Sequence, residues 1–589
     1  MKYRSRKPNS RRCSPYPTLN VFFLAMVMIS LSATSALAGS ATWNSNPVDN
    51  QWYNPNNWTA ATVPDGATDI ATFGSTTQPA ITISDSSDFT TVLNGITFNP
   101  GASAYILTVP ATGQDLTFQG RGIVNNSSNT QTFVINGLSN TTAVTFQDAT
   151  AGSNVNYVMA LTSGVLLPYL TFSGSASGGS ASFTCTDVHV TFNTGTTADH
   201  ATFTLNVALV DFMGGSSAGN GTFILNGGDN GASSVSMGHD GATAGNATFT
   251  VNGNATGFER DNLFSMVAFT SAGAAVFTAN GAVDTSHNPG VVSIGGPVDP
   301  ANATFIANPG TTGGAGGRIQ LQATTRNRAR VEVFGSGNGD VTNGTLDIST
   351  FTTPIVMPIG SLEGNGLVQL GQNTLNVGSN NDSTTFSGAI QDGGLYGGVS
   401  GSLTKTGSGT FTLSGANTYT GNTTVTQGTL LVTNRTGSAT GTGPVIINGG
   451  ILGGTGKISG AVTIGSATRF GTISPGLAGR AGKLTISRTI NFKQFGIYNA
   501  DLDSTHVTAD QVVATGVTIG SGATINLSDL GNAVLASGTV LTVVNNKAGV
   551  PISGTFSNLA DGSTLTVGSN TYLVSYEGGT GNDLTLTVQ

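Results

Sequence analysis

The chain has 589 residues, including 84 glycines, and only 8% of its residues are charged, against about 25% in ordinary globular domains. Gly and β-branched residues are poor helix formers, so this composition argues against long helices. The net charge of −8 at pH 7 argues against nucleic-acid binding through a general electrostatic field. Phe, Val, Ile and Leu recur at strand spacing, which argues against disorder and favours an all-β fold.

Residues 1–38 have the pattern of an export signal. Six basic residues precede the apolar run from Val21 to Leu31, and Ala36-Leu37-Ala38 is a small-x-small cleavage site. The apolar run is too short to span a bilayer as a permanent helix. We therefore expect cleavage before Gly39, a secreted or outer-surface location, and no transmembrane segment after cleavage. Loss of the signal leaves 15 basic and 29 acidic residues, a net charge of −14.

Residues 39–100 form a distinct opening segment. Trp43, Trp52 and Trp58 are the only tryptophans of the chain and lie within 16 residues. A solenoid has an open end whose apolar core must be covered, so these rings are predicted to belong to an N-terminal cap. The alternative is that exposed tryptophan rings stack on sugars.

A weak repeat built on Phe-x-x-Asn follows over residues 101–345. Its last five copies are spaced 20, 26, 28 and 28 residues apart. Each Phe is the predicted inward residue of a strand, and each Asn marks a turn, because Asn tolerates left-handed backbone and can bond its own turn. A fixed motif at variable spacing predicts a constant coil with one loop of changing length. The rings should then stack in an interior column about 4.8 Å apart. The copies begin at Phe133, Phe203, Phe223, Phe249, Phe277 and Phe305, and Phe183 continues the series upstream.

Arginines gather near the end of this segment. Arg326, Arg328 and Arg330 fall at alternate positions, with Arg318 upstream. On a strand the first three would share one face, opposite the apolar residues that alternate with them. One interpretation is a polyanion-binding stripe on an otherwise acidic molecule. The alternative is a solvated outer strand face.

The clearest repeat lies at residues 403–432, which read LTKTGSGTFTLSGANTYTGNTTVTQGTLLV. Short apolar alternations lie between Gly and Asn turn residues, which is typical of short strands half facing a core. Phe411 and Leu430 are 19 residues apart, as are Leu413 and Val432. Such a step is about one solenoid coil, which needs stacked neighbours because a single coil cannot bury its own apolar face.

This stretch resembles the autotransporter-associated β-strand repeat, whose common form runs close to LTKxGxGTLTLSGANTYTGxTTVxxGTL. The resemblance implies an exported passenger-type protein with a β-solenoid body. Residues 346–490 are expected to form the solenoid around this repeat, and residues 491–589 its C-terminal coils and cap. Together the patterns predict an all-β protein, a single-stranded right-handed parallel β-helix (β-solenoid) with an N-terminal cap, continuous from about residue 100 to residue 550.

Few residues offer chemistry. Cys185 is alone once the signal is removed and is predicted to be a small buried side chain. Residues 578–586 match the nonapeptide of RTX calcium proteins, but such sites need tandem copies. We expect no cofactor and no bound metal. The densest set of potential metal ligands is Asp501, Asp503, His506 and Asp510.

The rival function is a polysaccharide lyase or hydrolase, because parallel β-helices host such enzymes. Those sites need carboxylates that converge with a cation or a metal on neighbouring coils. Asp211, Asp229 and Asp284 follow their coil Phe at similar offsets, but no cation accompanies them, and the chain has four Glu and seven Lys. We therefore predict a non-enzymatic exported scaffold with a surface, adhesive or structural role. Its expected partners are cell-surface or environmental polysaccharides, not nucleic acid.

Overall fold

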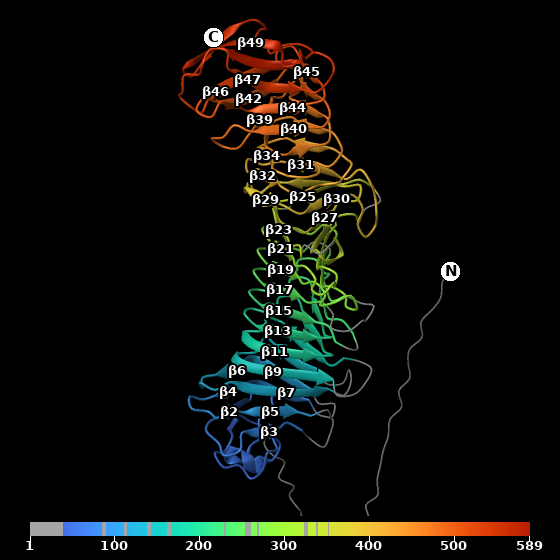
Figure 1. The fold of residues 1–589 in the computed structure, drawn as a ribbon. Helices are drawn as coiled ribbons and strands as arrows, with labels where there is room; N and C mark the ends of the chain where they lie inside the picture. The colour runs from blue at the N-terminus through green and yellow to red at the C-terminus, as the bar shows by residue number, and fades with distance from the viewer. Residues whose placement is uncertain are drawn as a thin grey trace, which may run out of the picture.

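The computed structural model describes residues 39–589 apart from 85–89, 111–114, 138–142, 162–166, 229–230, 254–260, 268–269, 323–327, 337–339 and 351–352. In the described part nearly every element is a strand, and the strands stack into one elongated β-solenoid (Figure 1). Its helical elements are three short 3-10 turns, and no helix there is long and apolar enough to cross a membrane. The predicted all-β solenoid is therefore confirmed, whereas the predicted export signal lies outside the described residues. The 3-10 turns are η1 (Pro55–Asn57), η2 (Thr59–Ala61) and η3 (Asp340–Thr342).

Sheet 1 runs along the N-terminal two thirds of the stack, and its neighbouring strands are parallel. In spatial order its 15 strands are β1 (Ala41–Thr42), β2 (Ile70–Phe73), β4 (Thr91–Phe98), β6 (Leu116–Asn125), β8 (Ala143–Gln147), β10 (Tyr169–Ser173), β12 (His189–Phe192), β14 (Leu209–Phe212), β16 (Ser234–Met237), β18 (Leu263–Met266), β20 (Val291–Ile294), β22 (Arg318–Leu321), β24 (Thr345–Asp347), β27 (Leu367–Gln369) and β30 (Ala389–Gln391).

Sheet 2 is the longest ladder and joins both halves of the molecule. A short strand, β43 (Thr508–Ala509), pairs antiparallel with one of its members, β42. The parallel strands are β3 (Ala80–Thr82), β5 (Ile106–Val109), β7 (Gln131–Gly137), β9 (Ser153–Leu161), β11 (Ser180–Thr186), β13 (Thr202–Asn206), β15 (Thr222–Asn226), β17 (Thr248–Val251), β19 (Val276–Ala279), β21 (Thr304–Ala307), β23 (Arg330–Val333), β26 (Ser361–Gly364), β29 (Thr384–Phe386), β32 (Thr410–Leu413), β34 (Thr429–Val432), β36 (Ile451–Gly454), β39 (Gly471–Pro475), β42 (Gly496–Asp503) and β46 (Thr524–Asp529).

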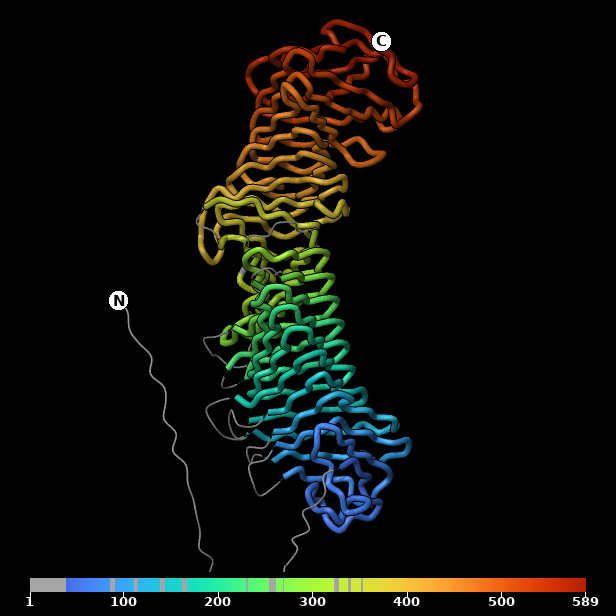
Figure 2. Tube along the Cα trace, turned by 180° about the vertical axis from the view of Figure 1, so that it is seen from behind, coloured from blue at the N-terminus to red at the C-terminus, as the bar shows by residue number. Residues whose placement is uncertain are grey.

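Two further sheets appear only in the C-terminal half. Sheet 3 consists of β25 (Val356–Ile359), β28 (Thr374–Val377), β31 (Ser402–Lys405), β33 (Thr423–Val425), β35 (Val445–Ile447), β38 (Val462–Ile464), β41 (Ile490–Phe492) and β45 (Val517–Ile519). Sheet 4 consists of β37 (Lys457–Ile458), β40 (Lys483–Ile486), β44 (Gln511–Ala514), β47 (Val540–Asn546), β50 (Asp583–Val588), β49 (Asn570–Gly578) and β48 (Thr564–Val567). Its last three pairings are antiparallel, so the parallel stack ends there, at the red end of the tube (Figure 2).

A column of aromatic rings runs through the interior behind sheet 2. Successive members are Cα partners on neighbouring strands. Their ring centroids lie 4.6–5.1 Å apart with interplanar angles of 2–14°. The predicted column is therefore confirmed, and the rings that form this part of it are Phe183, Phe203, Phe223, Phe249, Phe277 and Phe305.

The variable spacing of the Phe-x-x-Asn motif comes from one loop of each coil, as predicted. The last inward residue of each sheet 1 strand precedes the next Phe of the column by a nearly fixed step. Phe203 follows Phe192 by 11 residues, and Phe277 follows Met266 by 11. The variable residues lie in the connection from sheet 2 to the next sheet 1 strand, so the coil can lengthen there without disturbing its core.

The asparagine of the motif acts differently from the prediction. None of these residues has left-handed backbone, and Val207, which follows Asn206, has a φ of 58° instead. Each side-chain amide donates to the amide oxygen of the Asn one coil before it, so the amides form a ladder across coils rather than bonding their own turns. The bonds measure 3.1, 2.8, 2.7 and 2.7 Å along Asn206, Asn226, Asn252, Asn280 and Asn308.

The N-terminal end of the stack carries a cluster of aromatic side chains. All three tryptophans are buried, and Trp58 lies between Trp43 and Trp52 with ring centroids 5.0 and 4.8 Å away. All three rings pack against Phe73, an inward residue of sheet 1. Buried rings cover the first coil, which is the arrangement expected of a cap, and they leave no face free to stack on sugars.

The 403–432 repeat forms one coil and the start of the next. Phe411 is the Cα partner of Leu430, and Leu413 is that of Val432, so the 19-residue step is one coil. Buried polar side chains hold its turns. Asn417 accepts from the Ile390 amide at 2.8 Å and donates to a carbonyl oxygen of the following coil. In this part of the molecule buried polar groups therefore hold the glycine-rich turns, and the inward positions of sheet 2 carry Phe411, Leu430 and Leu452.

Candidate functional site

Arg318 lies apart from the arginines near β23. Arg318 opens β22 in sheet 1, whereas Arg330 opens β23 in sheet 2, so the two lie on different sheets. Arg328 precedes β23 and is exposed, as Arg330 is, with buried Ala329 between them. Arg326 lies outside the described residues. The expected alternation is thus present only at Arg328 and Arg330, and polyanion binding by these arginines stays a prediction.

Arg330 is held by two carboxylates. Its Nε lies 2.8 Å from Glu332 Oε1, and its Nη2 lies 2.9 Å from Glu363 Oε2. The two glutamates are Cα partners on the neighbouring parallel strands β23 and β26. Two of the four glutamates of the chain therefore meet across 31 residues of sequence, with the arginine between them.

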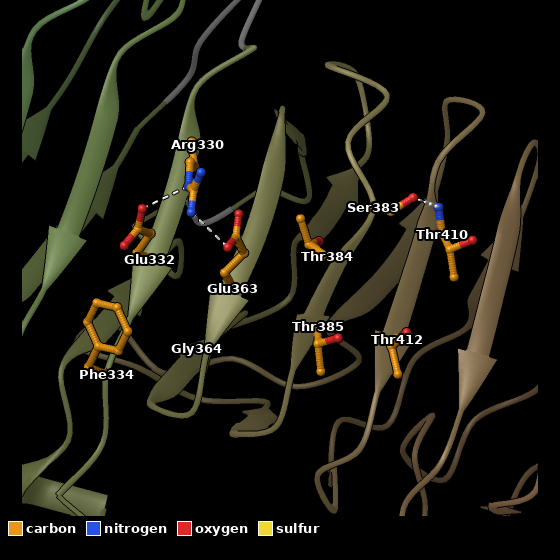
Figure 3. A pocket seen from close by; sticks show the side chains of 10 residues that line it. All are labelled: Arg330, Glu332, Phe334, Glu363, Gly364, Ser383, Thr384, Thr385, Thr410 and Thr412. Atoms are coloured by element: carbon orange, nitrogen blue, oxygen red, sulfur yellow. Dashed lines mark hydrogen bonds and ion pairs between the residues drawn. The ribbon is translucent and has the colours of Figure 1, made fainter.

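This cluster lines a groove of about 520 Å³ on the outer face of sheet 2. Figure 3 shows Arg330 and the two glutamates on one side of the groove and threonines on the other. The neighbouring strands β26 and β29 share a single register pair, Gly364 with Phe386, whereas β23 and β26 share four. The groove therefore lies where the fewest residues pair between neighbouring strands of sheet 2. Its lining residues are Arg330, Glu332, Phe334, Glu363, Gly364, Ser383, Thr384, Thr385, Thr410 and Thr412.

Gly364, at the end of β26, allows close approach to the backbone of β23 beside the groove. Its φ is +101°, and a Cβ there would approach the Val333 carbonyl oxygen to 2.1 Å. A side chain at this position would require the backbone to move. Across the groove, Ser383 Oγ accepts from the Thr410 amide at 3.0 Å, which fixes the rim of β29 against β32.

The charges in the groove are partly shielded from water. The side chains of Glu332 and Glu363 are 19% and 26% exposed, against 48% for Arg330. Burial raises the pKa of Glu363, Arg330 opposes the rise, and the negative charges of Glu332 and Asp382 add to it. Carboxylate oxygens held in this way are fixed hydrogen-bond acceptors beside several hydroxyl groups.

Phe334 interrupts the asparagine ladder. It follows Val331 by three residues, as each Asn of the ladder follows its Phe. Its backbone amide donates to the carbonyl of Ala307, one coil earlier, just as the Asn308 amide donates to Ala279. Its side chain is partly exposed and lines the groove. An aromatic ring therefore lies beside the charged cluster where earlier coils present an amide.

The other candidate residues do not assemble into a site. Asp503 pairs with His506 at 2.7 Å, while Asp510 is buried and accepts from the Gly482 amide at 2.7 Å. Burial raises the pKa of Asp510 to about 7. Asp501 accepts from the Ser528 hydroxyl instead. Within the described residues, no group of three or more His, Cys, Asp or Glu side chains could hold a metal ion.

The calcium-like nonapeptide closes a hairpin. It spans the turn between β49 and β50, where Gly578 and Asp583 are antiparallel partners. Asp583 Oδ1 accepts from the Asn546 amide at 2.8 Å, so this carboxylate binds backbone of its own sheet. Cys185 is fully buried, as predicted, and burial raises the pKa of its thiol to about 12.

Asp211 and Asp284, which follow their coil Phe at similar offsets, do not line up on one face. Asp211 lies on β14 and accepts from His189 of the preceding coil at 2.8 Å. Asp284 lies in a turn and pairs with His287, and Asp229 is outside the described residues. The pair that does meet, Glu332 and Glu363, could have been suspected from the matching segments Val331-Glu-Val and Leu362-Glu-Gly.

The fold and the groove together define the class of this protein: a parallel β-solenoid that carries a charged groove on the outer face of sheet 2. Residues 403–432 match the passenger-associated transport repeat, which confirms the likeness of this stretch to the autotransporter-associated β-strand repeat. No curated protein matches the chain.

Proposed function

We propose that this chain is a non-enzymatic, exported passenger-type scaffold with an adhesive role at the cell surface or in the medium. One observation supports this above the others. The passenger-associated repeat is not a separate module but one coil inside a continuous ladder, so the solenoid as a whole is the passenger-type body. Its partners under this proposal are cell-surface or environmental polysaccharides.

The outer face of sheet 2 suits binding over a large area. Outward threonines follow one another in register on successive coils, as at Thr184 with Thr204 and at Thr250 with Thr278. Each hydrogen bond from such a hydroxyl contributes only about 1 kcal/mol to the free energy of binding. Many weak bonds along a rigid rod favour multivalent adhesion over tight capture of one small molecule.

A polysaccharide lyase or hydrolase is the second candidate, and one observation favours it. Glu332 and Glu363 lie in register in a groove, and paired carboxylates are the parts that glycoside hydrolysis requires. Arg330 forms ion pairs with both carboxylates, and an ion-paired carboxylate is a weaker nucleophile and a weaker base. For this reason we favour the non-enzymatic scaffold.

Location and activity are tested separately. Protease treatment of intact host cells should digest the protein, and N-terminal sequencing should begin at Gly39. Retention in the cytoplasm with Met1 in place would contradict export. The purified protein should release neither reducing ends nor unsaturated sugars from polysaccharides, and turnover lost in Glu363→Gln would establish the enzyme instead.

A further inference from the structure

We propose that the groove on sheet 2 is a binding site for a neutral, hydroxyl-rich glycan chain. The inference rests on the proposed function, since it assigns one ligand class to one place on the scaffold. It departs from the expectation of a polyanion site at the arginines, because the groove carries a different balance of charge.

The charge of the groove disfavours an acidic ligand. Two carboxylates and one guanidinium give the cluster a net charge of −1, and Asp382 adds a further negative charge close to Glu363. The Arg330 guanidinium is already paired with both carboxylates, through Nε to Glu332 and through Nη2 to Glu363, so its charge is neutralised before a sulfate or uronate arrives. A polyanion would therefore meet repulsion without gaining the cation.

The same groups suit vicinal hydroxyls. A sugar hydroxyl donates to a carboxylate and accepts from another hydroxyl, and the groove presents both kinds of group. Glu332 and Glu363 are fixed by Arg330 before any ligand arrives, so little side-chain entropy is lost on binding. Thr385 and Thr412, Cα partners on β29 and β32, present hydroxyls on the opposite wall.

Phe334 supplies the apolar face. Sugar rings have one side rich in C–H groups, which packs against an aromatic ring, and Phe334 lines the groove beside Glu332 (Figure 3). The volume of about 520 Å³ lies within the range of about 300–1,000 Å³ usual for ligand pockets. The ligand is thus expected to place one or a few sugar rings against Phe334 and their hydroxyls against the charged cluster.

The test is calorimetric titration of the purified full chain. The neutral probes are xylo-, cello- and manno-oligosaccharides, and the acidic probes are polygalacturonate and dextran sulfate. At least one neutral probe should bind saturably, and Phe334→Ala and Glu363→Gln should each weaken it by about tenfold, which corresponds to ~1.4 kcal/mol. Ile224→Ala, an outward aliphatic residue of β15 on the same sheet, is the matched control and should leave the affinity unchanged. Circular dichroism spectra and melting curves verify that each variant is folded.

Three outcomes would overturn the inference: no neutral probe binds, binding is indifferent to both groove substitutions, or an acidic probe binds and Arg330→Gln abolishes its binding. The second outcome leaves the adhesive scaffold standing, because binding would then occur elsewhere on the rod. Conversely, groove binding by a protein that is not exported would support the site while refuting the proposed function.

Discussion

The coils from β11 to β21 and the coils from β31 to β36 build the same solenoid with different interiors. In the first set, stacked phenylalanines fill the core behind sheet 2, and an asparagine ladder ties neighbouring coils together. In the second set the equivalent inward positions hold Phe411, Leu430 and Leu452, and buried polar groups bond the turns. Repetition of a parallel register, rather than one kind of side chain, is therefore what both sets share.

The difference shows two ways to hold a turn. In the aromatic coils the amide ladder runs along the stack, so each bond links one coil to the next. In the repeat coils, Lys405 is 1% exposed and its Nζ donates to backbone carbonyls of Thr406, Gly407 and Gln427. The last of these carbonyls belongs to the following coil, so a buried lysine joins two glycine-rich turns.

The largest effect is expected from the aromatic column. Phe223→Ala should lower the free energy of unfolding by about 3–5 kcal/mol, because it leaves a cavity and removes stacking on both sides. Urea denaturation followed by circular dichroism measures the change. Thr222→Ala, an outward change on the same strand, should stay within about 0.5 kcal/mol. Equal effects of the two substitutions would show that the rings are not the core of these coils.

In the repeat coils a buried polar residue should also contribute strongly to stability. Asn417→Ala should cost about 2–3 kcal/mol, since it leaves a buried amide and a buried carbonyl without partners. The same denaturation experiment measures it, with exposed Asn422→Ala as the control. A loss as small as that of the control would mean that water replaces the amide and that the turns are not held as described.

Lys405 should make the stability of the repeat coils depend on pH. Burial lowers its pKa from 10.5 to about 8. Between these values the unfolded chain binds more protons at this position than the folded chain, so the free energy of unfolding rises with pH. From pH 8 to 9.5 the gain over Lys405→Met should be about 1–2 kcal/mol.

Thermal and urea denaturation of both proteins across this range test the gain. Lys457→Met, at an exposed lysine of β37, should track the wild-type protein at every pH. Parallel stability curves for wild type and Lys405→Met would show that the buried amine is not titrating in this window.

The smallest effect is expected in the asparagine ladder. Asn252→Ala removes two side-chain bonds at a partly exposed position and should cost about 1–2 kcal/mol. Thr250→Ala, on the outer face of the same strand, serves as the control. If the Asn252→Ala protein is as stable as this control, the asparagine ladder is a consequence of coil stacking and contributes nothing to the free energy of unfolding.

Much of the fold could be predicted because it repeats. The Phe-x-x-Asn copies and the 19-residue step of the 403–432 repeat gave the inward residues and the coil, and the register pairs confirm both. The role of the asparagines was mistaken, because a single coil does not reveal that the next amide lies within bonding distance. The signal peptide and the polyanion stripe remain predictions.

Alternation along a strand determines by itself which side chains face inward, because successive residues point to opposite faces. The sequence therefore settled the solenoid class and the Phe column. Only the tertiary structure decided which residues of different coils meet. The step from Val331 to its partner Leu362 contains β24, the regular sheet 1 strand of this coil, and β25, the first strand of sheet 3, and its length fixes Glu332 against Glu363. Such long-range register depends on loop lengths and on packing. The matching segments around the two glutamates could have suggested their pairing, but only the fold shows the groove that they line.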